Sequence, residues 1–115
     1  MTRLLLSLVL IAGSIATVHA EADADTEIRA LIQAVAESEC EFNRNGSLYS
    51  AETAAEHLEL KYSRGKRYAD SAEAFIERLA SKSSWSGEPY QMICDGETQP
   101  AGDWLNLRLE ALRSQ

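Results

Sequence analysis

The sequence predicts an α+β fold, with about four helices and a small three-stranded antiparallel sheet held by one disulfide bond. Three observations lead to this prediction. Four segments carry apolar residues at helical spacing, an Asn-Gly pair separates two short strand-like segments, and the chain of 115 residues contains only two cysteines. A chain of this length is sufficient for one small domain after removal of a leader.

Residues 1–20 are predicted to be a signal peptide. Arg3 precedes an apolar run over residues 4–16, and small residues then lead to Ala20. The run is too short to span the roughly 30 Å of a bilayer comfortably, so a retained membrane anchor is the minor alternative. We expect cleavage after Ala20, with cleavage after Ala22 as the alternative, and no stable membrane anchor afterwards.

The expected mature chain, residues 21–115, is one acidic domain. Loss of Arg3 leaves 10 basic and 18 acidic residues, which gives a net charge of −8. Such a charge repels phosphate backbones and anionic lipid headgroups, so nucleic-acid binding and membrane adsorption are not expected. A cationic partner remains open, although acidity of this size is usual for a soluble protein.

Cys40 and Cys94 are predicted to form a disulfide bond, because export brings them to an oxidising compartment. The bond would close a loop of about 55 residues, which contributes roughly 4 kcal/mol in the chain-entropy model. A free redox-active pair is disfavoured because the two cysteines do not form a C-x-x-C motif.

The first helix and a hairpin follow residue 25. Ile28, Leu31, Ile32 and Val35 have the spacing i, i+3, i+4, i+7 of an amphipathic helix, with Asp23 or Asp25 as its cap. Asn45-Gly46 then predicts a hairpin with strands at about 40–43 and 47–50, because both residues accept the positive φ of a type I′ turn.

Two further helices are expected before the last strand. Ser50 can cap a helix that ends at about Gly65, and Asp70 with Glu73 has the spacing of a capping box that opens a helix over 72–80.

The C-terminal part of the sequence predicts a strand and a helix. Residues 89–94 alternate between apolar and polar side chains up to a polar stop at Asp95-Gly96, which indicates a short strand. Pro100 begins a helix that continues to Leu112. The disulfide would place the strand against the hairpin and complete the three-stranded sheet.

The segment SKSSWSGEPY, residues 81–90, is the most polar loop. Its favoured interpretation is a helix end followed by a turn, because hydroxyls and Lys82 can bond the last helix carbonyls and Gly87 permits the turn. A ligand role stays open. A hydrolase that uses a serine of loop 81–87 with His57 or Lys82 as base is the alternative, but the segment has no G-x-S-x-G elbow and no S-x-x-K motif.

A second polar surface is expected at the hairpin tip. Arg44 has no evident structural role at the turn and could pair with a carboxylate or phosphate. We group Tyr49, Lys61 and Tyr62 with it. The alternative is an ordinary exposed arginine, which is common on turns. Asn45 also lies in a glycosylation sequon, which the turn explains equally well. His57, the single histidine after residue 20, is interpreted as a helix-surface residue, and no metal or cofactor is expected.

Two sequence blocks resemble the YfeK-like family of small, signal-bearing proteins of Gram-negative bacteria. The first contains Cys40, Phe42, Arg44-Asn45-Gly46 and Tyr49 and continues through His57-Leu58 to Lys61-Tyr62; the second contains Phe75-Ile76-Glu77, Ala80-Ser81, Ser83-Ser84, Ser86-Gly87 and Pro89-Tyr90. The resemblance covers about 40–112 and implies a single periplasmic domain of unknown function. It assigns no catalytic residue, and Trp85 and the connection 97–102 fall outside it.

The sequence therefore predicts a periplasmic binding or accessory protein of the cell envelope that is not catalytic. Its partner would be an unidentified envelope protein or a small ligand. The predicted binding surface joins the hairpin tip to the serine-rich loop and consists of Arg44, Asn45, Tyr49, Lys61, Lys82, Ser83, Ser84 and Ser86. A structural accessory protein without a defined site is the third interpretation.

Overall fold

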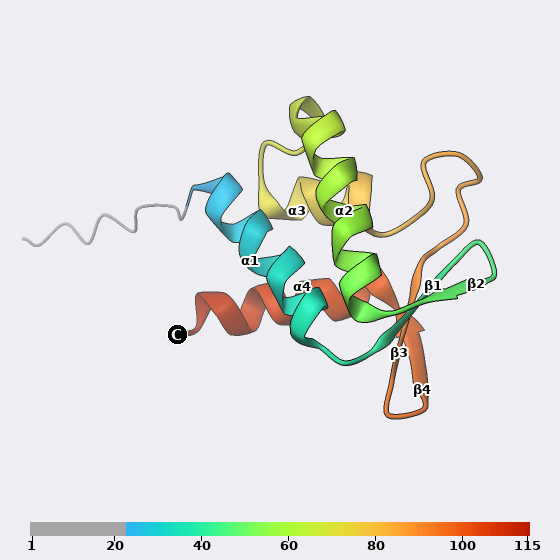
Figure 1. Ribbon diagram of the computed structural model, residues 1–115. Coiled ribbons are helices and arrows are strands. Elements are labelled where there is room, and N and C mark those ends of the chain that lie inside the picture. Colours follow the sequence, from blue (N-terminus) through green and yellow to red (C-terminus); the bar gives the residue numbers. More distant parts are fainter. Residues whose placement is uncertain (1–22) are drawn as a thin grey trace, which may run out of the picture.

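The structure, a computed structural model, describes residues 23–115. The predicted signal peptide, residues 1–20, lies outside them. The elements follow in the order α1 (Ala24–Glu37), β1 (Glu41–Arg44), β2 (Ser47–Tyr49), α2 (Ala51–Gly65), the 3-10 helix η1 (Lys66–Tyr68), α3 (Ala72–Phe75), the π-helix η2 (Ile76–Ala80), β3 (Gln91–Cys94), β4 (Glu97–Pro100) and α4 (Ala101–Arg113). Figure 1 shows the helices gathered on one side and the two hairpins on the other.

The α+β class is confirmed, but the sheet has four strands and not three. Its order is β2-β1-β3-β4, and every neighbouring pair is antiparallel. Asp95 and Gly96, interpreted from the sequence as a polar stop, have φ values of 52° and 78° and form the turn of a second hairpin. The extra strand β4 is polar and ends in Pro100, which is tolerated because β4 is an edge strand.

The first hairpin forms as predicted. Asn45 and Gly46 both have positive φ, 51° and 83°, as a type I′ turn requires. Strand β1 then pairs with β3 on its other side, with Phe42 opposite Met92. The predicted disulfide between Cys40 and Cys94 is present next to this pairing, with its Cα atoms 4.5 Å apart. The hairpin tip is thereby held beside the segment that leads into β3.

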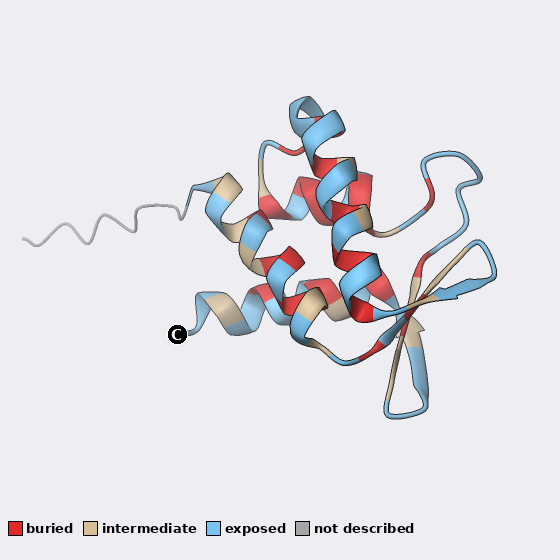
Figure 2. Ribbon diagram, viewed as in Figure 1, coloured by how far each residue is buried: buried red, intermediate tan, exposed pale blue. Residues whose placement is uncertain are grey.

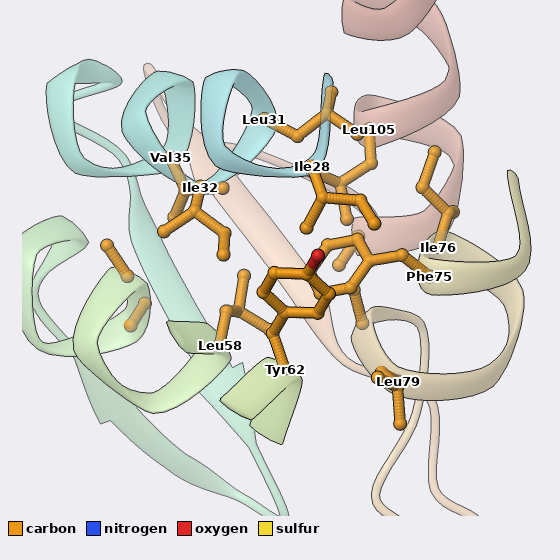
Figure 3. Close-up of a cluster of buried hydrophobic side chains, with 14 of the residues drawn as sticks. Ile28, Leu31, Ile32, Val35, Leu58, Tyr62, Phe75, Ile76, Leu79 and Leu105 are labelled. Atoms are coloured by element: carbon orange, nitrogen blue, oxygen red, sulfur yellow. The ribbon is translucent and has the colours of Figure 1, made fainter. Parts of the chain in front are cut away.

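The hydrophobic core lies among the four helices. Helix α1 packs against α2, α3 and α4, and its predicted apolar stripe is buried. Side chains from all four helices and η2 converge in the centre, including Ile28, Leu58, Phe75 and Leu105 (Figure 3). The buried faces of the helices point inward, whereas most of the β2 and β4 residues are exposed (Figure 2). None of the helices in residues 23–115 has the length and apolar character needed to cross a bilayer.

The ends of α2, α3 and η2 show which of the helix caps and helix bounds predicted from the sequence are correct. Ser50 caps α2 as predicted, since its Oγ accepts a hydrogen bond from the Thr53 amide. The third helix begins at Ala72 as predicted, but Ser71 and not Asp70 caps it, since its Oγ accepts a hydrogen bond from the Ala74 amide. The expected continuous helix over 72–80 changes to a π-turn after Phe75, and the hydroxyl of Ser81 donates to the Ile76 carbonyl at its end.

Candidate functional site

The hairpin tip and the serine loop, residues 81–89, lie side by side (Figure 1). The side-chain amide of Asn45 donates to Oγ of Ser83 at 3.3 Å, and the hydroxyl of Ser86 donates to Oδ1 of Asn45 at 2.6 Å. These two bonds join positions that are 38 and 41 residues apart in the sequence. The two polar segments that the sequence singled out therefore form one continuous surface.

The serine loop has a defined shape built around Ser83. The side chain is buried, and its Oγ accepts hydrogen bonds from the amides of Trp85 and Ser86, each at 3.2 Å. The Ser83 amide donates to the Glu88 carbonyl, and the Gly87 amide donates to the Ser83 carbonyl. Because three donors converge on the Ser83 hydroxyl, it supports the loop, as the turn interpretation expects.

A cleft of about 710 Å³ opens between α2, the hairpin tip, η2 and the serine loop. Its volume lies within the usual range for small-ligand sites. Helix α2 contributes His57, Lys61 and Arg64 from one face, because they have the spacing i, i+4, i+7. The complete lining consists of Arg44, Asn45, His57, Lys61, Arg64, Gly65, Tyr68, Arg78, Leu79, Ser83, Ser84, Trp85 and Tyr90.

The charge of this lining differs from that of the rest of the chain. Arg44, Lys61, Arg64 and Arg78 line the cleft and no acidic residue does, although the whole sequence has 18 acidic and 11 basic residues. Within residues 23–115, none of these four cations takes part in an ion pair; the ion pairs there belong to Arg29 and Arg113. The cleft therefore presents positive charge without a carboxylate partner in the described part of the chain.

One end of the cleft contains a hydrogen-bonded group made of Arg44, His57, Tyr90 and Lys61. Nη1 of Arg44 lies 2.6 Å from Nδ1 of His57, and Nε2 of His57 lies 3.4 Å from the Tyr90 hydroxyl. Nζ of Lys61 donates to the Tyr90 hydroxyl and to the Lys82 carbonyl, each at 3.1 Å. It also lies 4.9 Å from the centre of the Tyr90 ring.

The protonation states of this group follow from its burial and its crowding by cations. Burial, with the charges of Arg44 and Lys61, lowers the pKa of His57 from 6.5 to about 4. Burial and the charge of Arg44 lower the pKa of Lys61 from 10.5 to about 8. Burial raises the pKa of the Tyr90 hydroxyl. At neutral pH His57 and Tyr90 are uncharged, while Lys61 is mostly protonated.

The hydrogen bonds leave donors that point to no described acceptor. Nη1 of Arg44 lies 2.6 Å from Nδ1 and 3.0 Å from Nε2 of His57, so it contacts both ring nitrogens. The Tyr90 oxygen accepts a hydrogen bond from Lys61. A guanidinium has five N–H groups and no acceptor, and within residues 23–115 only Nη1 of the Arg44 guanidinium has a hydrogen-bond contact, so further Arg44 donors are left for a ligand. This end of the cleft is suited to a group that only accepts hydrogen bonds, which is what an anion does.

The structure separates the eight predicted surface residues into two groups. Arg44, Asn45, Lys61, Ser83 and Ser84 line the cleft.

The other three predicted residues lie elsewhere. Tyr49 stacks under the Arg44 guanidinium at 5.3 Å and lines a smaller cavity of about 280 Å³ behind it. Lys82 lines a different cavity, and Ser86 contacts Asn45 instead of the cleft. Tyr62, considered with Lys61, faces the core and donates to Asp25.

Several lining residues were not predicted. His57 was interpreted as a helix-surface residue, but it is half-buried in the cleft wall. Arg64, Tyr68, Arg78 and Tyr90 were assigned no role. The spacing of His57, Lys61, Arg64 and Tyr68 is a periodic polar stripe that could have indicated the α2 part of the lining. Among residues 23–115, no three His, Cys, Asp or Glu side chains lie close enough together to hold a metal ion.

Comparison with known proteins agrees with the resemblance seen in the sequence. Residues 22–113 match a family described as a family of unknown function, DUF5329. A protein of Salmonella typhimurium named Uncharacterized protein YfeK is 37% identical over 73 residues, which cover 63% of this chain and 61% of that protein. The match thus spans less than two thirds of the relative's length. No solved structure matches the chain. All the residues that line the cleft fall within the matched range.

Proposed function

Because the chain belongs to the family of unknown function DUF5329, no relative supplies an activity, and we propose from the site itself that this protein binds an anionic ligand in the cleft beside α2. The cleft carries four cations, no acidic lining residue and, in the described part of the chain, no ion pair that neutralises them. This is the observation that carries the proposal. Unneutralised cations in a concave site of an acidic protein attract and orient an anion.

The proposed role is binding without catalysis. His57 contacts Arg44 and Tyr90, and no hydrogen bond among residues 23–115 joins it to a serine. The Ser83 hydroxyl is engaged by three donors. A serine hydrolase needs a nucleophile within hydrogen-bond reach of its base, so these contacts favour binding over hydrolysis in loop 81–87.

The proposed location is the periplasm, with residues 1–20 removed on export. Two features support it: the arrangement of Arg3 before an apolar run, and the disulfide between Cys40 and Cys94. The intact mass and the free-thiol content of protein isolated from the periplasm test this part. Retention of residues 1–20 in the isolated protein, or two free thiols, would contradict it.

Binding is tested with inorganic phosphate, acetate and succinate, by calorimetry and by the amide chemical shifts of the hairpin tip and serine loop. We expect millimolar to submillimolar binding of these small anions, with shifts confined to residues around Arg44, Lys61 and Trp85. Lys61→Gln should weaken binding about tenfold, since it removes one charge-assisted hydrogen bond. Lys66→Gln is the matched control, because Lys66 is exposed on η1 outside the cleft.

The pH dependence provides an independent check. The pKa of Lys61 is about 8, so anion affinity should fall as the pH rises through that value and the ammonium loses its proton. This fall should be absent in Lys61→Gln. If the anions bind wild type and Lys61→Gln equally, or if the shifted amides lie elsewhere, the proposed site is wrong.

A further inference from the structure

The four cations of the cleft come from three different elements: Arg44 from β1, Lys61 and Arg64 from α2, and Arg78 from η2. Arg44 marks one end, because its guanidinium lies against His57. Arg78 marks the other end, where its guanidinium donates to the Tyr68 carbonyl at 3.3 Å. From position 57 to position 68 the chain advances eleven residues along α2 and η1. At about 1.5 Å per helical residue this corresponds to roughly 16 Å along the two helices, and we take this length as the separation of the two ends.

Lys61 belongs to the Arg44 end, and the lining between the two ends is mainly neutral apart from Arg64. Lys61 and Arg64 follow His57 along the same face of α2. Beyond them Gly65 adds no side chain and packs directly on Leu79, where an added Cβ would come within 3.0 Å of the leucine. Gly65 and Leu79 both line the cleft, so its wall is uncharged at the end of α2.

The opposite wall offers an exposed aromatic ring. Trp85 lies in the serine loop, lines the cleft and is 93% exposed. Its loop is held in place by Ser83, whose Oγ accepts the Trp85 amide hydrogen bond. A solvent-exposed indole provides apolar area for the body of a ligand, and its ordering costs little conformational entropy because it has only two χ angles.

We propose that the ligand is an elongated molecule with an acidic group near each end, held by Arg44 and Lys61 at one end of the cleft and by Arg78 at the other. A single inorganic anion is far too small to reach both ends. The neutral part of the ligand lies along Gly65 and Leu79 beneath Trp85. This inference rests on the proposed function and specifies its ligand class.

The test is a comparison of carboxylates that differ in length and in the number of charges. Tetradecanedioate in its extended form is long enough to reach from Arg44 to Arg78, whereas adipate is too short. Tetradecanoate, used below the concentration at which it forms micelles, has the same chain with one acid and controls for apolar contact. Binding of each is measured by calorimetry with wild type, Arg78→Gln and Arg108→Gln. Arg108 is the control because it is exposed on α4, outside the cleft.

We expect wild type to bind tetradecanedioate about tenfold more tightly than tetradecanoate, the factor that one charge-assisted hydrogen bond supplies. Arg78→Gln should remove this advantage and leave the affinity for adipate unchanged, and Arg108→Gln should behave as wild type. Equal affinity of wild type for tetradecanedioate and tetradecanoate would overturn the inference and identify a site for one acid group. If none of the three binds, and phosphate does not bind either, the proposed function itself fails.

Discussion

Removal of the Cys40–Cys94 disulfide should lower the free energy of unfolding by about 4 kcal/mol. The two residues are 54 positions apart, and the chain-entropy expression for a closed loop of about this length gives that value at room temperature. The native state should tolerate the loss, because β1 and β3 are already paired through backbone hydrogen bonds next to the bridge, with Glu41 opposite Ile93. The disulfide therefore stabilises the protein mainly by lowering the conformational entropy of the unfolded chain.

The assay is urea unfolding of the oxidised protein, of the same protein after reduction, and of the Cys40→Ala, Cys94→Ala double variant. Reduction keeps both cysteine side chains, so it separates the loop effect from the packing that the double variant loses at Cys40, which is buried. We expect both perturbed forms to remain folded and to keep their affinity for small anions. A loss below about 1 kcal/mol on reduction would refute the reasoning, since it would show that the bond does not constrain the unfolded ensemble.

Two further predictions concern the serine loop and the acidic surface. Ser83→Ala should lower the free energy of unfolding by about 1–2 kcal/mol and speed hydrogen exchange of the two amides that donate to Oγ of Ser83. Ser84→Ala changes an exposed position in the same loop and should have neither effect. Arg113 donates to Glu27 and Glu73 and lowers the pKa of each below its usual 4.5. A lowered carboxyl pKa means that the stability from these pairs is present above pH 4.5 and is lost as the pH falls through the lowered values. Arg113→Gln should therefore flatten the acid limb of the stability profile and cost about 0–1 kcal/mol at neutral pH; an unchanged acid limb in thermal unfolding would contradict this.

The sequence predicted those elements whose signals are local. The apolar stripe of α1 is buried, and Ser50 and Asn45-Gly46 act as cap and turn because their side chains or φ angles decide the backbone by themselves. Strand β4 was not predicted because its sequence, ETQP, lacks the alternating apolar residues that indicate a strand. Its polar residues become a strand only through pairing with β3, which the Asp95-Gly96 turn imposes.

The candidate site was predicted in part for the same reason. Arg44 was found because it is a charged residue at a recognisable turn, and Lys61 was grouped with it. Tyr90 was interpreted only as a strand residue, and Arg78 fell within a predicted helix without an assigned role. Their positions in the cleft depend on how η2 and β3 pack against α2, and no pattern within one element carries that information.

The lowered pKa values of His57 and Lys61 indicate that the cleft disfavours additional positive charge. Burial is the larger cause of the lowered pKa of both His57 and Lys61, and the nearby charge of Arg44 lowers both further, so the folded chain holds these groups in less water and closer to like charge than the unfolded chain does. For Lys61 the unfolded state binds more protons between pH 8 and 10.5, so stability rises with pH over that interval and the penalty is complete below it. A carboxylate beside Lys61 would stabilise the folded chain, in the way that carboxylates pair with Arg113 and Arg29. An anion in the cleft would supply the missing charge and raise the pKa of Lys61, so binding near pH 8 should be accompanied by proton uptake, and calorimetry in buffers of different ionisation enthalpy would measure it directly.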